Sequence, residues 1–127
     1  MMKPDRRKKR LRAYRSGLRG EWIAIGYYLM RGYWPRARRY KTPVGEVDLV
    51  VQRGRRIVFV EVKVRQSGSS DALAAISPKQ QARISRAALH FLTIRKVPTT
   101  MDKRFDVLVI GGTLQVIHTP NAWFADI

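Results

Sequence analysis

Apolar and polar residues alternate most clearly between residues 45 and 65, which predicts two paired strands. A period of two runs through GEVDLVVQ (45–52) and returns in RIVFVEVKVR (56–65). This period is typical of strands with two unlike faces. Gly54 lies between the runs, where a two-residue turn that begins with glycine favours a type II′ hairpin. We therefore expect an antiparallel hairpin in which Leu49 lies opposite Val60.

Two other segments carry apolar residues at helical spacing. The first runs from 18 to 31 and ends at Gly32, a common stop signal. The second begins at Ser77, the expected N-cap, with Pro78 in the first turn and Gln80 closing a capping box. The two apolar stripes comprise Leu18, Trp22, Ile25 and Leu29 in the first helix, and Ile84, Ala87, Ala88, Phe91 and Leu92 in the second.

The remaining apolar runs predict three more strands. They cover residues 33–41, which mix aromatic and basic side chains, and then 104–110 and 114–118. Residues 121–127 form a short apolar tail that we expect to be one helical turn packed on the core. The predicted order is α-β-β-β-α-β-β, so the fold class is α/β, with a mixed five-stranded sheet flanked by helices.

The chain is most simply one domain with a basic extension. Residues 1–15 contain a dense run of arginine and lysine with little apolar content, which predicts a disordered arm. Residues 16–127 form the expected single domain, long enough to bury a core without disulfides. Residues 66–75 are small and polar, and we expect them to form a mobile loop on the substrate side.

Composition narrows the class of partner. Lys and Arg total 26 against 9 Asp and Glu, so the net charge of +17 favours polyanions, with nucleic acid ahead of an anionic membrane surface. The chain has no cysteine and two distant histidines, which argues against a zinc centre and fits a reducing compartment. No apolar run is long enough to span a bilayer and no signal peptide is evident, so we expect a cytoplasmic protein without a membrane association.

The predicted hairpin holds two carboxylates against each other. Asp48 falls opposite Glu61, and Glu46 falls opposite Lys63 on the same face. Like charges directly opposite each other destabilise a sheet. A positive group should therefore lie between the two acids, and both a divalent metal such as Mg²⁺ and an arginine are candidates.

These residues resemble a nuclease motif. Asp48, then twelve residues, then Glu61-Val62-Lys63 are similar to the D…(D/E)xK motif of restriction-endonuclease-like nucleases. The segments GEWIAIGYYL, GEVDLVV, IVFVEVKVR, RFDVLVI and HTPNAW together resemble the YraN family of small bacterial proteins. That family is regarded as nuclease-like and as distantly similar to archaeal Holliday junction resolvases.

The resemblance implies a restriction-endonuclease-like core and a metal-dependent DNA endonuclease. Asp48 and Glu61 would hold Mg²⁺, or Mn²⁺ in its place, with the carbonyl of Val62 and with Glu21 in the first or second coordination shell. Lys63 would orient or help deprotonate the attacking water. The implied substrate is branched DNA such as a Holliday junction, for which a two-fold homodimer is expected. No small-molecule cofactor is implied.

Other basic residues are candidates for contact with the nucleic-acid backbone. They are Arg36, Arg38, Arg39, Arg65, Lys79 and Arg83. Two alternatives to the nuclease stay open: a non-catalytic nucleic-acid-binding protein, and an accessory protein associated with RNA or the ribosome. The nuclease ranks first because so few acids are available, yet three of them fall on one predicted hairpin face.

Overall fold

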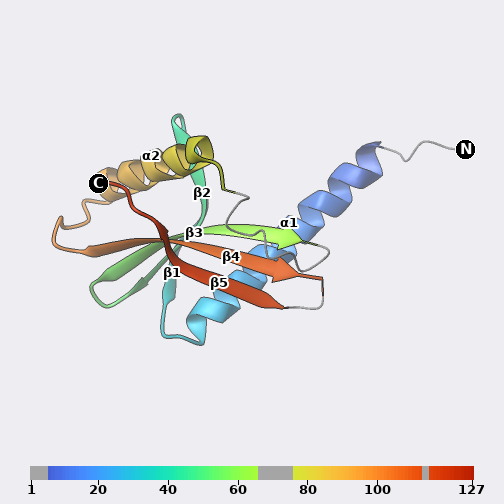
Figure 1. The fold of residues 1–127 in the computed structure, drawn as a ribbon, viewed down its shortest axis with the longest axis horizontal. Helices are drawn as coiled ribbons and strands as arrows, with labels where there is room; N and C mark the ends of the chain where they lie inside the picture. The colour runs from blue at the N-terminus through green and yellow to red at the C-terminus, as the bar shows by residue number, and fades with distance from the viewer. Residues whose placement is uncertain (1–5, 66–75, 113–114) are drawn as a thin grey trace, which may run out of the picture.

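The computed structural model describes residues 6–65, 76–112 and 115–127, with side chains from residue 18 onward (Figure 1). The order of elements is α-β-β-β-α-β-β, as the sequence predicts. The loop expected at 66–75 lies outside the described residues. The elements are α1 (Arg6–Leu29), β1 (Trp34–Thr42), β2 (Gly45–Arg53), β3 (Arg56–Arg65), α2 (Pro78–Ile94), β4 (Asp102–Gly111) and β5 (Val116–Trp123).

Helix α1 begins earlier than its apolar stripe indicates. It starts at Arg6, so most of the segment expected to be a disordered arm is helical, and the helix extends beyond the sheet in Figure 1. Arginine, lysine, leucine and alanine are good helix formers. Because the C-terminal half of α1 is already anchored on the sheet, adding turns at its N-terminus carries no new nucleation cost.

The five strands form one open sheet in the order β1-β2-β3-β4-β5. Strands β3 and β4 are parallel and are joined through α2, whereas the other neighbours are antiparallel. The sheet is therefore mixed. The β2–β3 hairpin has the predicted register, with Leu49 opposite Val60, and Gly54 adopts the positive φ (56°) that the turn requires.

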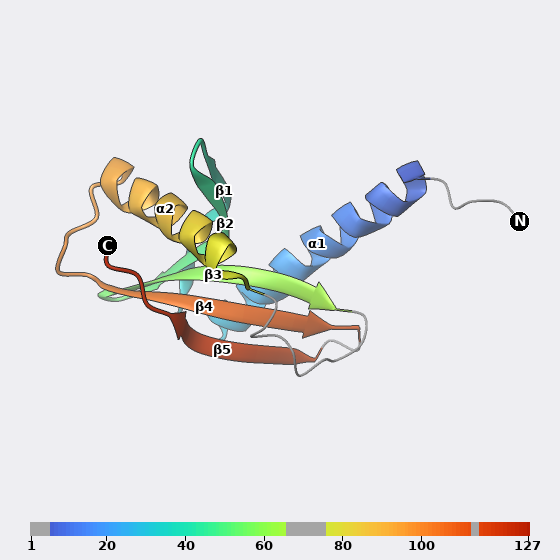
Figure 2. The ribbon, with the colours of Figure 1, turned by 45° about the horizontal axis from the view of Figure 1, so that its top comes forward.

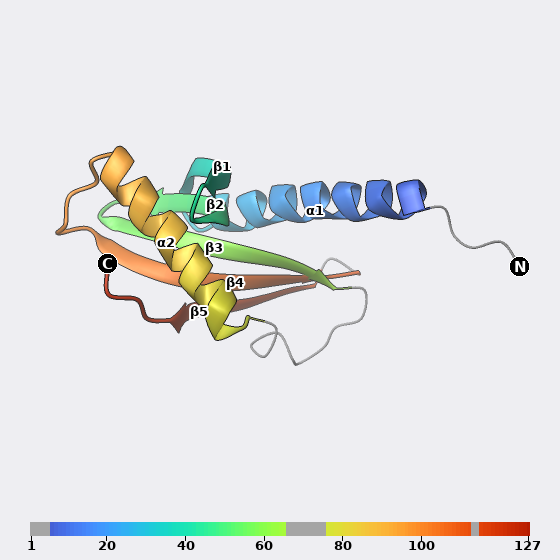
Figure 3. The ribbon, with the colours of Figure 1, turned by 90° about the horizontal axis from the view of Figure 1, so that it is seen from above.

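The helices cover opposite faces of the sheet (Figure 3). On one face, Ala24, Ile25 and Tyr28 of α1 pack against Val58 and Val60. On the other face, α2 buries the predicted stripe of Ile84, Ala87, Ala88, Phe91 and Leu92 against residues that include Ile57 and Phe59. Each face of β3 therefore contacts a different helix.

The C-terminal segment differs from the prediction. Strand β5 continues to Trp123, so the expected helical turn at 121–127 is absent, although this tail does pack on the core. The ring of Trp123 stacks on Phe105 at a centroid distance of 4.9 Å, which keeps the segment extended along β4. In the described part of the chain, no helix combines the length and the apolar character that crossing a membrane demands.

Candidate active site

The candidate site lies where β2 separates from β3. Their backbone pairing runs from Arg53–Arg56 only as far as Leu49–Val60, whereas β3 stays paired with β4 to its last residue. One residue beyond the last pair, Oδ2 of Asp48 accepts a hydrogen bond of 2.8 Å from the backbone N–H of Val62. Beyond this point the β1–β2 hairpin rises from the sheet toward α2 (Figure 2).

Asp48 and Glu61 are neighbours, as predicted, although the backbone pairing of β2 with β3 ends one residue earlier; Glu61 is buried and Asp48 is half-buried. Burial raises the pKa of Asp48, and the charges of Glu21 and Glu46 raise it further, while the hydrogen bond from Val62 opposes the shift. Burial raises the pKa of Glu61 to about 8, and the charge of Asp48 adds to this effect. Glu61 is only 7% exposed. Lys63 opposes the shift at Glu61, and further positive charge beside the pair would be stabilising.

Two residues contact the carboxyl group of Glu61. The ammonium of Lys63 lies 3.3 Å from Oε1, and the side-chain amide of Gln80 donates a hydrogen bond of 3.1 Å to the same oxygen. Lys63 therefore pairs with Glu61 along β3 and not with Glu46 across the hairpin. Ser77 is the N-cap of α2 as predicted, but the side chain of Gln80 reaches the site and does not close a capping box.

Glu21, which the resemblance places in the first or second coordination shell of the metal, is buried on α1. Its Oε1 accepts a bond of 2.6 Å from Nε of Arg39, while Oε2 is buried and has no hydrogen-bond partner. Arg39, predicted to bind nucleic acid, is therefore engaged by Glu21 in this structure. Its positive φ of 51° shows an unusual backbone turn at this point of β1.

Two cavities meet at Glu46 and connect the acids to a basic surface. One cavity, of about 190 Å³, is lined by Glu21, Arg39, Lys41, Glu46, Val47 and Asp48. The other, of about 290 Å³, is lined by Glu46, Glu61, Ser77, Lys79, Gln80, Arg83 and Ile84. Acidic side chains thus lie at the centre of the region, and lysine or arginine lines each side.

The predicted basic residues divide into two groups. Lys79 and Arg83 project from α2 into the cavity that contains Glu61. The other positions face different neighbours: Arg36 bonds Gln52, Arg38 lies over the ring of Trp22, and Arg65 ends β3. Lys79 and Arg83 therefore share a cavity with Glu61, and Arg39 shares one with Asp48.

The ligand set around the acid pair fits Mg²⁺. Carboxylate oxygens are ligands that Mg²⁺ prefers, and it is commonly held by one or two carboxylates with several waters. Glu21 lines the same cavity as Asp48, and its buried Oε2 has no hydrogen-bond partner, which a nearby cation would supply. Within the described ranges, no three His, Cys, Asp or Glu side chains are close enough to form a metal cluster by themselves. The candidate ligands are thus Asp48 and Glu61, with Glu21 nearby.

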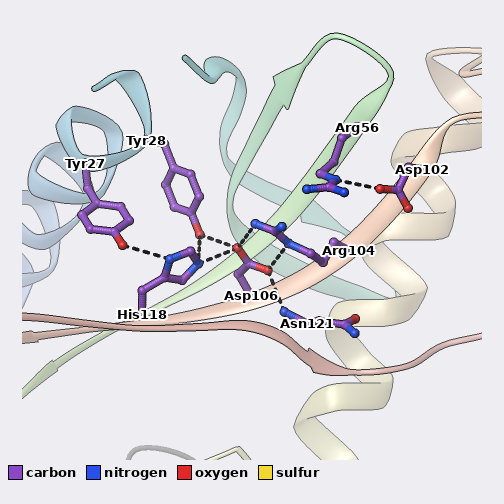
Figure 4. Close-up of polar contacts among 8 residues, drawn as sticks. All are labelled: Tyr27, Tyr28, Arg56, Asp102, Arg104, Asp106, His118 and Asn121. Atoms are coloured by element: carbon purple, nitrogen blue, oxygen red, sulfur yellow. Dashed lines mark hydrogen bonds and ion pairs between the residues drawn. The ribbon is translucent and has the colours of Figure 1, made fainter. Parts of the chain in front are cut away.

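A second polar cluster, centred on Asp106, ties α1 to β4 and β5 (Figure 4). Asp106 pairs with Arg104, and it also accepts hydrogen bonds from Tyr28 and from the backbone of Asn121. His118 lies 2.7 Å from the same carboxylate. The polar atoms of this cluster have partners, which is typical of a structural network.

These features define an α/β protein with an open mixed sheet and a buried acid pair at a strand separation. A model described as "Uncharacterised protein family UPF0102" matches residues 20–110. A UPF0102 protein of Parvibaculum lavamentivorans is 46% identical over 113 residues, covering 89% of this chain and 84% of that protein. A UPF0102 protein of Mesorhizobium japonicum is 38% identical over 115 residues, covering 91% of each. The chain belongs to the UPF0102 family, the YraN family that its motifs resemble.

Proposed function

We propose that this protein is a metal-dependent nuclease that hydrolyses phosphodiester bonds in DNA. The observation that carries the proposal is the pair of half-buried Asp48 and buried Glu61, with the ammonium of Lys63 3.3 Å from Glu61. Burial of two adjacent acids is unfavourable without a cation. A protein that only binds polyanions has no evident use for such a pair.

The side chains have separate roles in the proposed reaction. Asp48 and Glu61 would hold Mg²⁺, with Glu21 and the carbonyl of Val62 as further candidates. Bound Mg²⁺ supplies a water of lowered pKa and polarises the phosphoryl oxygen. The N–H of Val62 fixes Asp48 and the amide of Gln80 fixes Glu61, so both carboxylates are held in place before substrate binds.

The basic side chains would handle the substrate. The ammonium of Lys63 is placed to orient the attacking water and to offset charge on the phosphate. Lys79 and Arg83 line the same cavity as Glu61, where they would bind the neighbouring phosphates. Contacts of this kind recognise backbone and shape rather than base sequence.

The test is a cleavage assay with Mg²⁺, Mn²⁺ or EDTA on labelled four-way junction, duplex and single-stranded DNA. Glu61→Ala should lose about a hundredfold or more of the cleavage rate while still binding in a gel shift. The matched control is Glu46→Ala, which removes an exposed glutamate from the same cavity and should retain most of the activity. Equal rates for wild type and Glu61→Ala would refute the proposal.

We further propose that the DNA substrate is branched. Cutting a four-way junction requires two symmetric strand cleavages, so we expect a two-fold homodimer if that is the substrate. Analytical ultracentrifugation at assay concentrations tests this expectation. A monomer that still cuts junctions at both strands would contradict it.

A second candidate is a nucleic-acid-binding protein without catalysis. It is favoured by one observation: the ammonium of Lys63 and the side-chain amide of Gln80 both contact Glu61 and offset part of its charge. This reading predicts that Asp48→Ala leaves function intact and that neither Mg²⁺ nor Mn²⁺ supports cleavage. Tighter binding of RNA than DNA at equal salt would further favour a role on RNA.

A further inference from the structure

The side chain of Trp22 is exposed where the helical pattern places it in the core. It is 60% exposed, whereas its neighbour Glu21 is 6% exposed. The buried face of α1 therefore includes Glu21 and excludes the indole. A large aromatic ring in solvent, one residue from a buried acid at the candidate site, is available to a ligand.

The indole has a fixed position beside the site. The guanidinium of Arg38 lies over the ring, 4.6 Å from its centroid, and the next residue on β1, Arg39, bonds Glu21. Two consecutive residues of α1 thus contact two consecutive residues of β1. The Glu21–Arg39 pair lines the acidic cavity with Asp48, and the Trp22–Arg38 pair is one residue away from it along each element.

We infer that Trp22, supported by Arg38, stacks an unpaired nucleobase of a DNA strand whose backbone passes the acid pair. Exposed aromatic rings within basic surfaces bind single-stranded nucleic acid in this way, since every base has a π face. Bases inside a continuous duplex are already stacked and cannot cover the ring. The inference rests on the proposed function and specifies its substrate as DNA with unpaired nucleotides next to the scissile phosphate.

The test measures binding by fluorescence anisotropy in EDTA, so that no cleavage occurs. The probes are an oligo-dT strand, a blunt duplex, and the same duplex with an unpaired flap. Trp22→Ala should weaken binding of the strand and the flapped duplex by about tenfold or more, since stacking contributes about 1–3 kcal/mol per base. Binding of the blunt duplex should not change, and Trp22→Phe should recover most of the loss.

Trp34 provides a matched control. It is 71% exposed and begins β1, roughly 16 Å from Arg39 along an extended strand. Trp34→Ala should leave all three affinities as in wild type. An equal loss for both variants, or an unchanged ratio of flapped to blunt binding in Trp22→Ala, overturns the inference.

A spectroscopic measurement separates stacking from lost stability. In Trp34→Phe, which keeps Trp22, oligo-dT should quench tryptophan emission, and this quenching should disappear when Trp22→Phe is added. Quenching that survives in the double variant also overturns the inference. The outcome is independent of cleavage: a protein that stacks the flap but cuts nothing would refute the nuclease alone, and a nuclease indifferent to Trp22 would refute only this inference.

Discussion

At the scale of single residues, Glu61 combines a buried carboxyl group with an acidic neighbour. Burial and the charge of Asp48 raise its pKa from 4.5 to about 8. A group with a raised pKa contributes its full stabilisation below the unfolded value. That contribution is lost as the pH rises through the folded value. The metal-free protein should therefore lose stability between about pH 4.5 and pH 8 because of Glu61.

Replacement of this acid gives the first prediction. In EDTA near pH 9, Glu61→Gln should unfold with a free energy roughly 1–3 kcal/mol higher than wild type, because it removes a buried charge that Asp48 repels. Near pH 4.5 the two proteins should be equally stable, since Glu61 is then protonated. Urea unfolding at both pH values measures the difference.

The control for this prediction is Glu46→Gln, which alters an exposed glutamate on β2 and should change stability little. Addition of Mg²⁺ should raise the melting temperature of wild type and leave that of Glu61→Gln unchanged, because only the native site binds the ion. If Glu61→Gln were more stable than wild type by the same amount at pH 4.5 and at pH 9, this explanation would be contradicted.

The acid pair, Lys63 and Glu21 were predicted from sequence, whereas the contacts that Gln80 and Arg39 make with these acids were not. Opposition of Asp48 and Glu61 follows from the period of two and from the turn at Gly54, both of which are local. The hydrogen bond from Gln80 to Glu61 depends on how α2 crosses the sheet, which the local sequence does not determine. The capping-box pattern instead predicted that the side chain of Gln80 would bond the backbone N–H of Ser77. The pairing of Arg39 with Glu21 depends on a left-handed backbone residue in β1, for which the sequence contains no glycine signal.

At the scale of elements, Gly45 sets how closely β2 approaches α2. A Cβ atom at this position would lie 2.1 Å from the carbonyl oxygen of Arg83, in the backbone of α2. No side chain can rotate away to relieve this contact. The beginning of β2 can therefore lie this close to α2 only with glycine at this position.

Gly45→Ala should consequently destabilise the protein by about 1–3 kcal/mol or more, as overpacking of a rigid contact does. It should also lower cleavage activity, since the strand that carries Asp48 must shift. Gly26→Ala is the control: nothing lies within 4 Å of its added Cβ, and in the helix it should stabilise by up to about 1 kcal/mol. Thermal melts of the two variants should therefore move in opposite directions.

The Asp106 cluster joins three elements through one buried carboxylate. Burial by itself would raise the pKa of Asp106. Hydrogen bonds from His118, Arg104, Asn121 and Tyr28 outweigh burial and lower the pKa to about 2. A group with a lowered pKa stabilises the fold above its unfolded value, and this stabilisation is lost as the pH falls through the folded value. The relevant window is about pH 4 to pH 2.

Asp106→Asn should destabilise the protein at neutral pH by about 3–5 kcal/mol, because it leaves Arg104 without its buried partner. The loss relative to wild type should shrink as the pH falls from about 4 toward 2. Asp102→Asn, which breaks the exposed pair with Arg56, should change stability little. Unfolding titrations over this pH range distinguish the two, and equal losses would show that the cluster contributes no more than a surface pair.

The two helices show where hydrophobic patterning succeeds. The stripe of α2 was predicted in full because its buried residues are all apolar. The buried face of α1 instead includes Glu21 and Tyr28, while Trp22 and Leu29 are exposed. Polar side chains can be buried when they have partners, here Arg39 and Asp106. A periodicity argument cannot identify such partners in advance.

At the scale of the whole molecule, the net charge of +17 acts together with the position of the acid pair. Lys79 is exposed in the first turn of α2 and lines the cavity with Glu61. Lys96 is exposed just beyond the other end of the helix, roughly 25 Å away at 1.5 Å per residue. If nucleic acid lies across the candidate site, Lys79 should contact a phosphate and Lys96 should not, although both carry the same charge.

Salt dependence distinguishes these roles. Each phosphate contact releases counterions, so the slope of log K against log salt falls by about 1 when one contact is removed. Lys79→Gln should reduce the slope by about 1 and weaken binding of every DNA sequence alike, while Lys96→Gln should leave the slope as in wild type. Anisotropy titrations in EDTA across a salt series measure both. Equal slopes for the two variants would mean that the net positive charge of the protein attracts the nucleic acid nonspecifically. The cavity beside Glu61 would then make no specific phosphate contact through Lys79.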